Sequence, residues 1–555
     1  GTVADLTNRF LQAYGSPNFV KMPASADAYE LAIKKMHGVA AMAGFDVENA
    51  DFVISFGSGV IQGWGAPVRM IKANSAWKET GTTFTQVEPR KSITAAKADK
   101  WLPIKPGTET VLALGLAHLI VKNHPHQALG STELDAALAA YYPTKVAEET
   151  GIDEDVIVEL AGAFARAKKP LALYGRGRGS TPGSVGDAMA VHALNVLVGI
   201  INKAGGVWLV DGNETVAWPE FAKAAGADGA RVDGAGSGPF EESAHLPSRL
   251  IQAVLSDDYP IQALFVSNAN PLYSLPDSQA VQKAFAKIPY IVSFSSYMDE
   301  TAASADLILP NHHYLERLED VPSPAGYPEK MMLLARPVVE PQFNTMHTGD
   351  VLMKLAGAVG GSVAEAFAWE NYEACLQEVL ADVWDTLDEQ GYVVNEGSAL
   401  ATDPASVNLA GLDAGPVAIE GGSDYPLVFM PYDSLRLSSG YIGNPPFMNK
   451  TVEETILKGN DSLVEMNPQT AKKARVREGD AAVIETPRGR ARVRVHLYDG
   501  IRPGVIAMPR GLGHTAYDDY LANKGVNVNE LIGPVEDPAS GLDAAWGIRA
   551  KLSKA

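Results

Sequence analysis

Cysteine is nearly absent from this sequence. The 555 residues include one Cys, Cys375, in a stretch at residues 369–387 whose pattern predicts a helix. A single thiol cannot form an intrachain disulfide, and it cannot supply the ligands of a Cys-ligated zinc site or an iron–sulfur cluster. We therefore expect Cys375 to be a buried structural thiol, and we expect no such metal centre to be held by this chain alone.

Basic residues are scarce relative to acidic ones. There are 46 Lys and Arg residues against 66 Asp and Glu residues, which gives a formal net charge of -20 at pH 7. A surface of that sign repels the phosphate backbone of DNA or RNA. Nucleic acid is therefore excluded as an expected partner.

The sequence has no long hydrophobic run. Its longest apolar stretches, at residues 111–121 and 191–201, are interrupted by His, Asn or Gly and fall short of the roughly 20 residues that a bilayer-spanning helix needs. We therefore expect no membrane-spanning segment. The chain starts at Gly1 rather than at Met, next to a stretch predicted to be helical (residues 3–14), so we expect that a leading segment is missing.

Strands and glycine-rich turns near the start predict an α/β unit. The apolar run at residues 51–59 has the length of a buried parallel strand and ends at Gly57 and Ser58. A second strand-like run ends near Glu88 and Arg90. Open α/β sheets bind ligands at the carboxyl ends of their strands, so these strand tips are candidate binding positions.

The same order of segments returns far downstream. A strand-like run ends at Asn268, Asn270 and Pro271, a second run follows, and the decapeptide at residues 301–310 repeats most of the decapeptide at residues 94–103. For either copy alone, small residues that merely close turns would be a sufficient explanation. Two copies with similar tips predict a duplicated unit whose tips bind a ligand.

A third strand-like run lies between the two copies. It ends in a glycine- and arginine-rich tip that includes Gly175, Arg176 and Gly177, and a helix is predicted at residues 186–201. Backbone N–H groups at a helix start, beside arginines, suit a diphosphate. Ser180 stands where the dinucleotide fingerprint GxGxxG needs its last glycine, so a nicotinamide dehydrogenase is only a weak alternative.

The C-terminal part of the chain has a different character. After a stretch rich in Gly, Asp and Ala at residues 391–424, short β-runs alternate with turn signals. This pattern predicts a small β-barrel. His514, Asn527 and Asn529 fall on its polar loop tips.

Together, these segments resemble the molybdopterin-dinucleotide oxidoreductase family, of the dimethyl sulfoxide reductase type that includes polysulfide reductase and formate dehydrogenase. The resemblance covers nearly the whole chain. It implies an α/β fold with two related Rossmann-like parallel-sheet domains, at residues 1–170 and at residues 171–420 with a linker. A six-stranded, double-psi-like β-barrel, similar to the family's dinucleotide-binding domain, is expected at residues 421–555. Such proteins usually begin with an iron–sulfur domain, which agrees with a missing leading segment.

The family binds two pterin–guanine dinucleotides related by a pseudo-twofold axis, and the duplicated unit is the sequence counterpart of that symmetry. The resemblance implies that contacts to such a dinucleotide, functional or vestigial, fall on the strand tips and the barrel loops. The residues concerned are Gly57, Ser58, Glu88, Arg90, Gly175, Arg176, Gly177, Asn268, Asn270, Pro271, His514, Asn527 and Asn529. The family usually has Asn-Pro after the first glycine, where this chain has Ser58 and Gly59, so guanosine contacts are not assured at that tip.

The position of the family's metal ligand shows the main departure. In the family a Cys, selenocysteine, Ser or Asp follows shortly after a Tyr-Gly-Ser/Thr-Pro-Asn signature, which this chain has at residues 14–18. No Cys follows it here, and Ser25 and Asp27 are the weak alternative ligands for molybdenum or tungsten. Asp27 is also placed to cap a helix at residues 29–36. We therefore expect no metal and no cofactor; if one is bound, molybdopterin guanine dinucleotide is the candidate.

The resemblance implies a scaffold subunit that is not itself catalytic. Segments at residues 315–320 and 337–348 resemble polysulfide-reductase-type subunits, and metal-free relatives occur in menaquinone-reducing complexes. We therefore expect a membrane-bound respiratory complex on the periplasmic face of the cytoplasmic membrane. It would pass electrons between a multihaem cytochrome c or an iron–sulfur subunit and menaquinone, with a quinone-binding integral membrane subunit as a further partner. The alternative is an active molybdenum bis-dinucleotide reductase of polysulfide, thiosulfate or a similar substrate.

Overall fold

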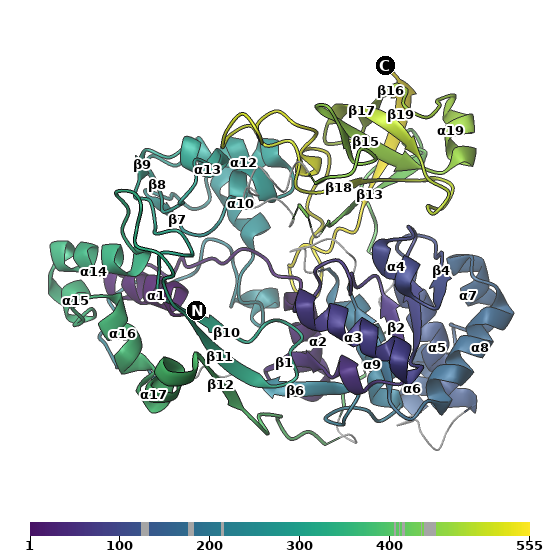
Figure 1. Cartoon of the computed structure of the whole chain (residues 1–555), viewed down its shortest axis with the longest axis horizontal. Coiled ribbons are helices and arrows are strands. Elements are labelled where there is room, and N and C mark those ends of the chain that lie inside the picture. Colours follow the sequence, from purple (N-terminus) through teal and green to yellow (C-terminus); the bar gives the residue numbers. More distant parts are fainter. Residues whose placement is uncertain are drawn as a thin grey trace.

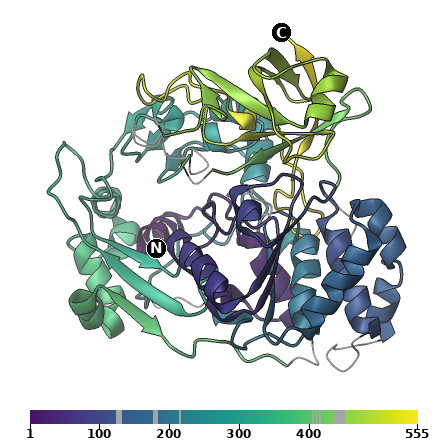
Figure 2. The ribbon, with the colours of Figure 1, turned by 45° about the vertical axis from the view of Figure 1, so that its right-hand side comes forward.

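Four bodies of secondary structure surround the middle of the molecule in the computed structural model (Figure 1). They are two parallel α/β units, an antiparallel layer with helices, and a β-barrel that lies above the first α/β unit and beside the second in the two views (Figure 2). The structure describes residues 1–123, 132–175, 183–212, 216–403, 407–409, 411–412, 417–434, 436–437 and 451–555.

The first α/β unit is built on a parallel sheet in the order β4-β3-β2-β5. Its strands are β2 (Phe52–Phe56), β3 (Thr83–Val87), β4 (Lys100–Leu102) and β5 (Pro170–Tyr174). β2 and β5 are buried throughout, because helices cover both faces of the sheet. The chain continues from β2 to β3 on one side and returns to β5 on the other. The strand order therefore reverses between β2 and β5, which is where α/β sheets bind ligands.

Helices pack around this sheet into one hydrophobic core. They are α2 (Asp27–His37), α3 (Pro67–Thr80), α4 (Ile93–Lys97), α5 (Glu109–Asn123), α6 (Thr132–Leu138), α7 (Pro143–Thr150), α8 (Glu154–Arg166) and α9 (Val185–Leu197). A two-stranded antiparallel ribbon, β1 (Ala41–Phe45) with β6 (Val207–Asp211), belongs to the same core.

The first unit extends past the domain boundary that we predicted at residue 170. β5 begins at that residue and pairs with β2, and α9 and β6 contribute to the same core as β2. The physical reason is that the sheet needs β5 to complete its second side. We therefore assign β5, α9 and β6 to the first unit.

The second α/β unit has a parallel sheet in the order β7-β8-β9. Its strands are β7 (Leu264–Val266), β8 (Ile291–Ser293) and β9 (Leu307–Ile308). Its helices are α10 (Pro247–Leu255), α11 (Pro271–Ser274), α12 (Ser278–Phe285) and α13 (Glu300–Ala303). This unit is smaller than the first, but its strands follow one another in the order that the repeat predicts.

The two repeated decapeptides occupy equivalent environments. In the first unit, Asp99 Oδ2 accepts a hydrogen bond from the backbone N–H of Phe84 on β3 (2.8 Å). In the second, Asp306 Oδ2 accepts one from the backbone N–H of Ile291 at the start of β8 (2.7 Å). Each aspartate fixes the end of a strand in the same way, so the predicted duplication is confirmed at the level of single hydrogen bonds.

The sequence did not lead us to expect a separate antiparallel layer. It consists of β10 (Glu319–Pro322), β11 (Lys330–Ala335) and β12 (Tyr392–Asn395), with α14 (Thr348–Val359), α15 (Gly361–Glu365), α16 (Tyr372–Val379) and α17 (Ala381–Gln390). The N-terminal helix α1 (Thr2–Tyr14) packs in the core of this layer and not in that of the first unit, to which we had assigned it. Cys375 lies fully buried in the same core, so the predicted structural thiol is confirmed.

The C-terminal part forms a closed six-stranded barrel, as predicted. Its strands pair in the ring β15-β17-β16-β19-β13-β18, and β18 returns to β15. They are β13 (Leu427–Tyr432), β15 (Asp461–Met466), β16 (Ala481–Glu485), β17 (Arg490–Leu497), β18 (Val505–Pro509) and β19 (Ile548–Lys554). β14 (Leu457–Lys458) pairs antiparallel with the start of β15, and α19 (Pro468–Ala474) follows β15.

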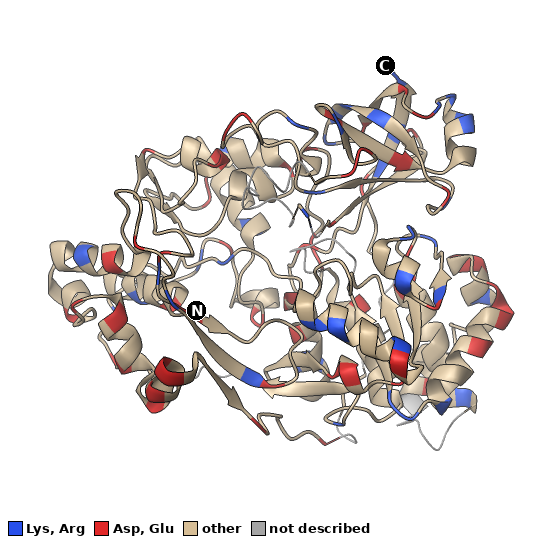
Figure 3. Ribbon diagram, in the orientation of Figure 1, with Lys and Arg blue, Asp and Glu red and all other residues tan. Residues whose placement is uncertain are grey.

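Charge is distributed unevenly over these bodies. Acidic side chains are concentrated on α8 and α17, whereas lysines lie on α19 of the barrel (Figure 3). Within the described residues, no helix combines the length and the apolar character needed to cross a bilayer.

Candidate functional site

The tips of β2 and β5 touch each other at the reversal of the first sheet. Gly57 has φ 74°, a left-handed conformation that favours glycine. A Cβ atom at Gly175 would lie 3.1 Å from both Cα and Oγ of Ser58, so only glycine allows this approach without a shift. Arg176 and Gly177 lie outside the described residues.

A glutamine that we did not predict lies beside Ser58. Gln86, on β3, is fully buried, and its Nε2 donates to the carbonyl oxygen of Ser58 (3.2 Å) and to Oε2 of Glu88 (3.1 Å). Two oxygens here, Ser58 Oγ and Gln86 Oε1, are buried without a hydrogen-bond partner in the described part of the chain. Unpaired buried oxygens are costly, so this tip is suited to a ligand that donates hydrogen bonds.

Arg90 connects the first unit to the barrel instead of facing an open site. Its guanidinium forms an ion pair with Glu465 on β15, in which Nη2 lies 2.8 Å from Oε1. The guanidinium also lies 3.8 Å from the ring centroid of Tyr432, whose hydroxyl donates to Glu465 (3.1 Å). Glu88 accepts a hydrogen bond from the backbone N–H of Ser92 (2.8 Å), and burial raises the pKa of Glu88. We call the contact of Arg90 with Glu465 and Tyr432 the first seam.

The second unit meets the barrel through a different set of groups. Asn270 is fully buried; its Nδ2 donates to Glu300 (2.7 Å) and its Oδ1 accepts from the Thr301 hydroxyl (2.8 Å). Glu300 also binds Nδ1 of His514 (3.1 Å) and the backbone N–H of Thr515 (2.8 Å), both on a barrel loop. Burial alone would raise the pKa of Glu300, but the hydrogen bonds of His514 and Asn270 lower it to about 2.

Two barrel asparagines complete this second seam. Asn527 and Asn529 each donate from Nδ2 to the carbonyl oxygen of Tyr273, at 3.0 and 2.9 Å. The Tyr273 ring stacks on His514 with centroids 3.8 Å apart. Asn529 Oδ1 is buried without a partner among the described residues. Among the predicted residues, only Asn268 remains exposed at this tip, in a left-handed conformation with φ 49°.

The structure therefore divides the predicted residues: Gly57, Ser58 and Gly175 meet at the tip of the first sheet, whereas Arg90 lies in the first seam and the barrel residues His514, Asn527 and Asn529 lie in the second. Pro271 also lies here, as the first residue of α11. Sequence reasoning missed Gln86, Tyr273, Glu300, Tyr432 and Glu465, whose partners come from distant segments. Glu300 carried a usable signal, because it directly precedes the second decapeptide.

The start of α2 is the position where a metal ligand was considered. Ser25 is exposed there. Asp27 is the first residue of the helix, not its cap, and its Oδ2 accepts from the backbone N–H of Ala24 (2.9 Å). The capping position falls on Ala26, which corrects our assignment of that role to Asp27. Burial raises the pKa of Asp27 to about 6, and burial together with the charge of Asp27 raises the pKa of Glu30 to about 7.

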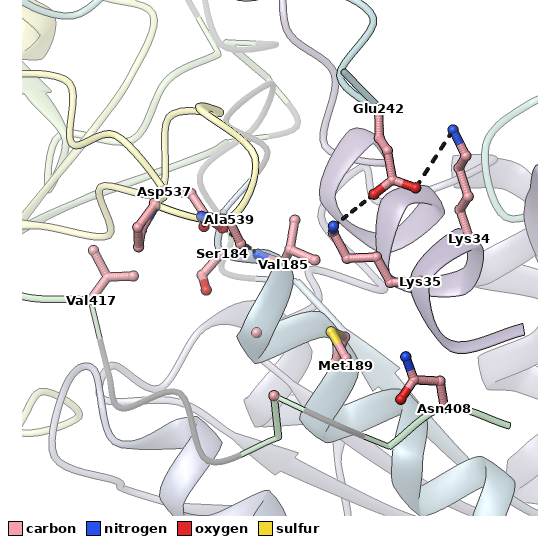
Figure 4. Close-up of a pocket in the computed structure, with 13 residues that line it drawn as sticks. Lys34, Lys35, Ser184, Val185, Met189, Glu242, Asn408, Val417, Asp537 and Ala539 are labelled. Carbon is pink, nitrogen blue, oxygen red and sulfur yellow. Dashed lines mark hydrogen bonds and ion pairs between the residues drawn. The ribbon is translucent and has the colours of Figure 1, made fainter. Parts of the chain in front are cut away.

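A cavity of about 520 Å³ lies between α2, α9 and the C-terminal segment that follows the barrel loops (Figure 4). On one side Glu242 pairs with Lys35 (2.7 Å) and Lys34 (3.8 Å). On the other, Asp537 accepts from the backbone N–H of Val185, the first residue of α9 (2.7 Å). This carboxylate stands where a diphosphate was expected to meet the helix start, so it competes with such a ligand.

The histidine pair after β9 does not form a metal site. His312 Nδ1 bonds to the Thr345 hydroxyl (2.7 Å), whereas His313 Nε2 bonds to the Tyr297 hydroxyl (3.1 Å), so the two rings diverge. Across the described ranges of the chain, no three His, Cys, Asp or Glu side chains gather as a metal site.

Comparisons with known proteins agree with this architecture. The family described as molybdopterin oxidoreductase matches residues 3–358, and the molybdopterin dinucleotide binding domain matches residues 444–546. The chain is 34% identical to a protein of Nitratidesulfovibrio vulgaris, the menaquinone reductase, molybdopterin-binding-like subunit; the match covers 100% of this chain and 78% of that protein.

More distant relatives are named as subunits of reductases. The thiosulfate reductase molybdopterin-containing subunit of Salmonella typhimurium is 25% identical over 95% of this chain and 77% of its own length. Among solved structures, the acetylene hydratase of Pelobacter acetylenicus superposes with a TM-score of 0.77 at 20% identity, covering 99% of this chain and 84% of that one. The last likeness bears on the fold alone.

Proposed function

This chain belongs to the molybdopterin oxidoreductase family, and on that premise we propose that it is a scaffold subunit of a membrane-bound, menaquinone-reducing complex. The observation that carries the proposal is the 34% identity, over the whole chain, to a menaquinone reductase molybdopterin-binding-like subunit. In this proposal, the chain has no redox metal of its own. It lies on the periplasmic face of the cytoplasmic membrane, with an iron–sulfur subunit, a multihaem cytochrome c and a quinone-binding integral membrane subunit as partners.

The organic part of a pterin dinucleotide fits some of the described residues. Ser58 and Gln86 at the first sheet, and Asn529 on the barrel, each have a buried side-chain oxygen without a partner in the described part of the chain. Donor groups of a bound ligand would satisfy these oxygens. When bound, such a dinucleotide supplies the dithiolene sulfurs that hold molybdenum or tungsten. The chain's own residues would only bind and orient it.

The metal end of the cofactor fits less well. No thiolate stands at the start of α2, where the family has its ligand, and Ser25 is exposed. Asp27 is engaged with the backbone N–H of Ala24. A soft metal favours a thiolate over a carboxylate ligand. This mismatch supports a subunit without its own metal.

The two seams support the scaffold role. Arg90 and Glu465 in the first seam, and Glu300 and His514 in the second, bond to each other across the boundary between sheet and barrel. These groups hold the three bodies in place. A rigid body of this kind can present surfaces to partner subunits without taking part in the chemistry.

The experiment that tests the proposal compares the isolated chain with the complex purified from native membranes. We expect the complex to reduce menaquinone, and the isolated chain to reduce neither polysulfide nor thiosulfate. In the complex, Asp27→Asn should leave quinone reduction within about twofold of the original rate. A loss of activity in Asp27→Asn, with the complex intact, would favour the alternative of an active molybdenum reductase that uses Asp27 as a ligand.

A further inference from the structure

An exposed apolar loop projects from the surface between β11 and α14, on the left of Figure 1. We call residues 337–343 the apolar loop; every one of them is exposed. The side chains of Val338 and Phe343 are 72% and 81% exposed. Scattered apolar residues are ordinary on a surface, but large ones gathered on one segment mark an interaction site.

The apolar loop is held in shape by hydrogen bonds to the segment after β9. The backbone N–H groups of Val338 and Val339 donate to the carbonyl oxygen of Leu315 at 2.7 and 3.2 Å. The backbone N–H of Gln342 donates to Oε1 of Glu316 (3.0 Å), whose other oxygen accepts from the backbone of the same segment. These bonds fix the backbone with its apolar side chains pointing into solvent, so the exposure is built into the fold.

Aromatic side chains continue the apolar loop into a wider surface. Tyr314 is exposed, and its ring lies 4.2 Å from that of His313, measured between centroids. The Tyr297 ring lies 6.2 Å from the same histidine, and Met298 beside it is exposed. We call the apolar loop together with Tyr297, Met298, Tyr314 and Leu315 the docking surface. Tyrosine and methionine are enriched at protein interfaces, because they bury a large area with few polar groups.

We propose that the docking surface binds another protein subunit, one whose facing surface is apolar at its centre and basic at its rim. The inference rests on the proposed function, since it needs a complex with partner subunits. A binding partner would bury Val338 and Phe343 as central anchors, which is how most of the binding energy of an interface is concentrated.

Negative charge at the docking surface favours a protein partner with a basic rim. Glu340, within the apolar loop, is exposed and forms no ion pair with any described residue. The nearby arginines are already neutralised: Arg336 pairs with Asp388 (2.6 Å) and Arg317 with Glu319 (2.9 Å). With its arginines neutralised, the exposed carboxylate of Glu340 disfavours an anionic lipid surface, and it disfavours a second copy of a chain whose net charge is -20.

Photo-cross-linking tests the proposal in the complex purified from native membranes. Phe343 is replaced by benzoylphenylalanine in a tagged chain, and the matched control carries the same group at Tyr14, which is 64% exposed on α1. We expect position 343 to cross-link to a different polypeptide that co-purifies in fixed ratio, and position 14 not to cross-link to it. A cross-link to a second copy of this chain, to lipid, or to nothing would overturn the proposal.

Substitutions measure how much the docking surface contributes to retention of the partner polypeptide. The double variant Val338→Ser with Phe343→Ser should weaken retention of that polypeptide on the order of tenfold or more, because it removes two central anchors. The matched control is Val68→Ser on α3, where Val68 is 74% exposed, and it should leave retention unchanged. Glu340→Lys should weaken retention more than Glu340→Gln, and the difference should shrink at high salt. Equal retention in all these variants would overturn the proposal.

The outcomes separate this proposal from the proposed function. If the double variant still assembles and the complex still reduces menaquinone, the docking surface is wrong and the scaffold function stands. If the unmodified chain has no partner polypeptides in native membranes, the proposed function fails and the docking surface fails with it.

Discussion

The two α/β units share equivalent internal hydrogen bonds, but they contact the barrel through different kinds of side chain. Thr94 Oγ1 accepts from the backbone N–H of Ile61 (3.1 Å), and Thr301 Oγ1 accepts from that of Leu272 (3.3 Å), so the buried threonines of the two decapeptides play the same part. The seams differ, since one is an arginine–carboxylate pair and the other a histidine–carboxylate contact. The duplication therefore preserves what folds each unit, whereas the contacts to a third body have diverged.

Arg90→Ala tests the difference between the seams and should have the largest effect on stability. The side chains of Arg90 and Glu465 are only 18% and 7% exposed, so the substitution leaves a buried carboxylate without its ion-pair partner and with only the Tyr432 hydroxyl bonded to it. We expect a loss of about 3 kcal/mol in the free energy of unfolding of the barrel body. Hydrogen exchange of barrel amides against denaturant measures it.

The matched control for that variant is Lys551→Ala. Lys551 pairs with Glu485 at 2.8 Å on the open surface of the same barrel, with both side chains well exposed. Exposed pairs contribute less than about 1 kcal/mol. Equal losses in the two variants would contradict the assignment of Arg90 to a buried seam.

Glu300→Gln should weaken the second seam by about 2 kcal/mol. The charged hydrogen bonds of the carboxylate are lost, and the NH2 group of the buried amide is placed against other hydrogen-bond donors. The pKa of Glu300 is lowered in the folded state to about 2, from an ordinary value of about 4.5. Stability from this group is therefore complete above about pH 4.5 and is lost as the pH falls toward 2. Unfolding free energies measured across this range should show the step in the original chain. A step of the same size in Glu300→Gln would contradict the assignment.

Gly175→Ala should cost about 1 to 2 kcal/mol, because the added Cβ lies 3.1 Å from Ser58 Cα and forces the tips of β2 and β5 apart. Gly357→Ala, within α14, is the matched control. A Cβ at that position has no neighbour within 4 Å, so the change should be neutral or stabilising by up to about 1 kcal/mol. Thermal unfolding of both variants checks the difference, and equal effects would show that the tips are not in close contact.

A buried histidine pair should separate the two units by pH. His37 Nε2 and His192 Nε2 lie 2.8 Å apart, and His192 Nδ1 bonds to the Tyr29 hydroxyl (2.8 Å), all within the first unit. Burial lowers the pKa of His37 to about 4 and that of His192 well below its ordinary value. Stability from neutral histidines is complete above about pH 6.5 and falls as the pH drops below it.

The first unit should therefore lose about 2 kcal/mol or more near pH 5, and more than the second unit, beside which burial lowers the pKa of the single residue His245 to about 4. Hydrogen exchange of the amides of β2 and β8 at pH 7.5 and pH 5 distinguishes the units. His37→Gln should reduce the loss in the first unit. Parallel losses in both units would show that the histidine pair is not the cause.

Sequence reasoning succeeded where local pattern decides structure. The apolar run that ends at Gly57 predicts β2, and the alternating runs after residue 424 predict the barrel, because burial and turn chemistry are encoded within a few residues. The decapeptide repeat identified the duplication before any contact was known. The packing of α1 in the antiparallel layer was missed because α1 and α14 lie more than 300 residues apart in the chain.

The sequence predicted which residues belong to the site but not what they contact. It places Arg90, Asn270 and His514 as polar residues at strand tips and loops, and it gives no more than that. Their use in seams depends on Glu465 and Glu300, whose positions are set by tertiary packing. The exposure of Phe343 is likewise a property of the folded loop, because it depends on hydrogen bonds to the distant residues Leu315 and Glu316.

The central claim is that this chain supports electron transfer without a redox metal of its own. The most direct test is the molybdenum and tungsten content of the chain, measured by mass spectrometry after it has been purified from its native complex and separated from its partners. We predict less than about one metal atom in twenty chains, because no strong protein ligand stands at the start of α2. One molybdenum or tungsten atom per chain, lost in Asp27→Asn, would contradict the account.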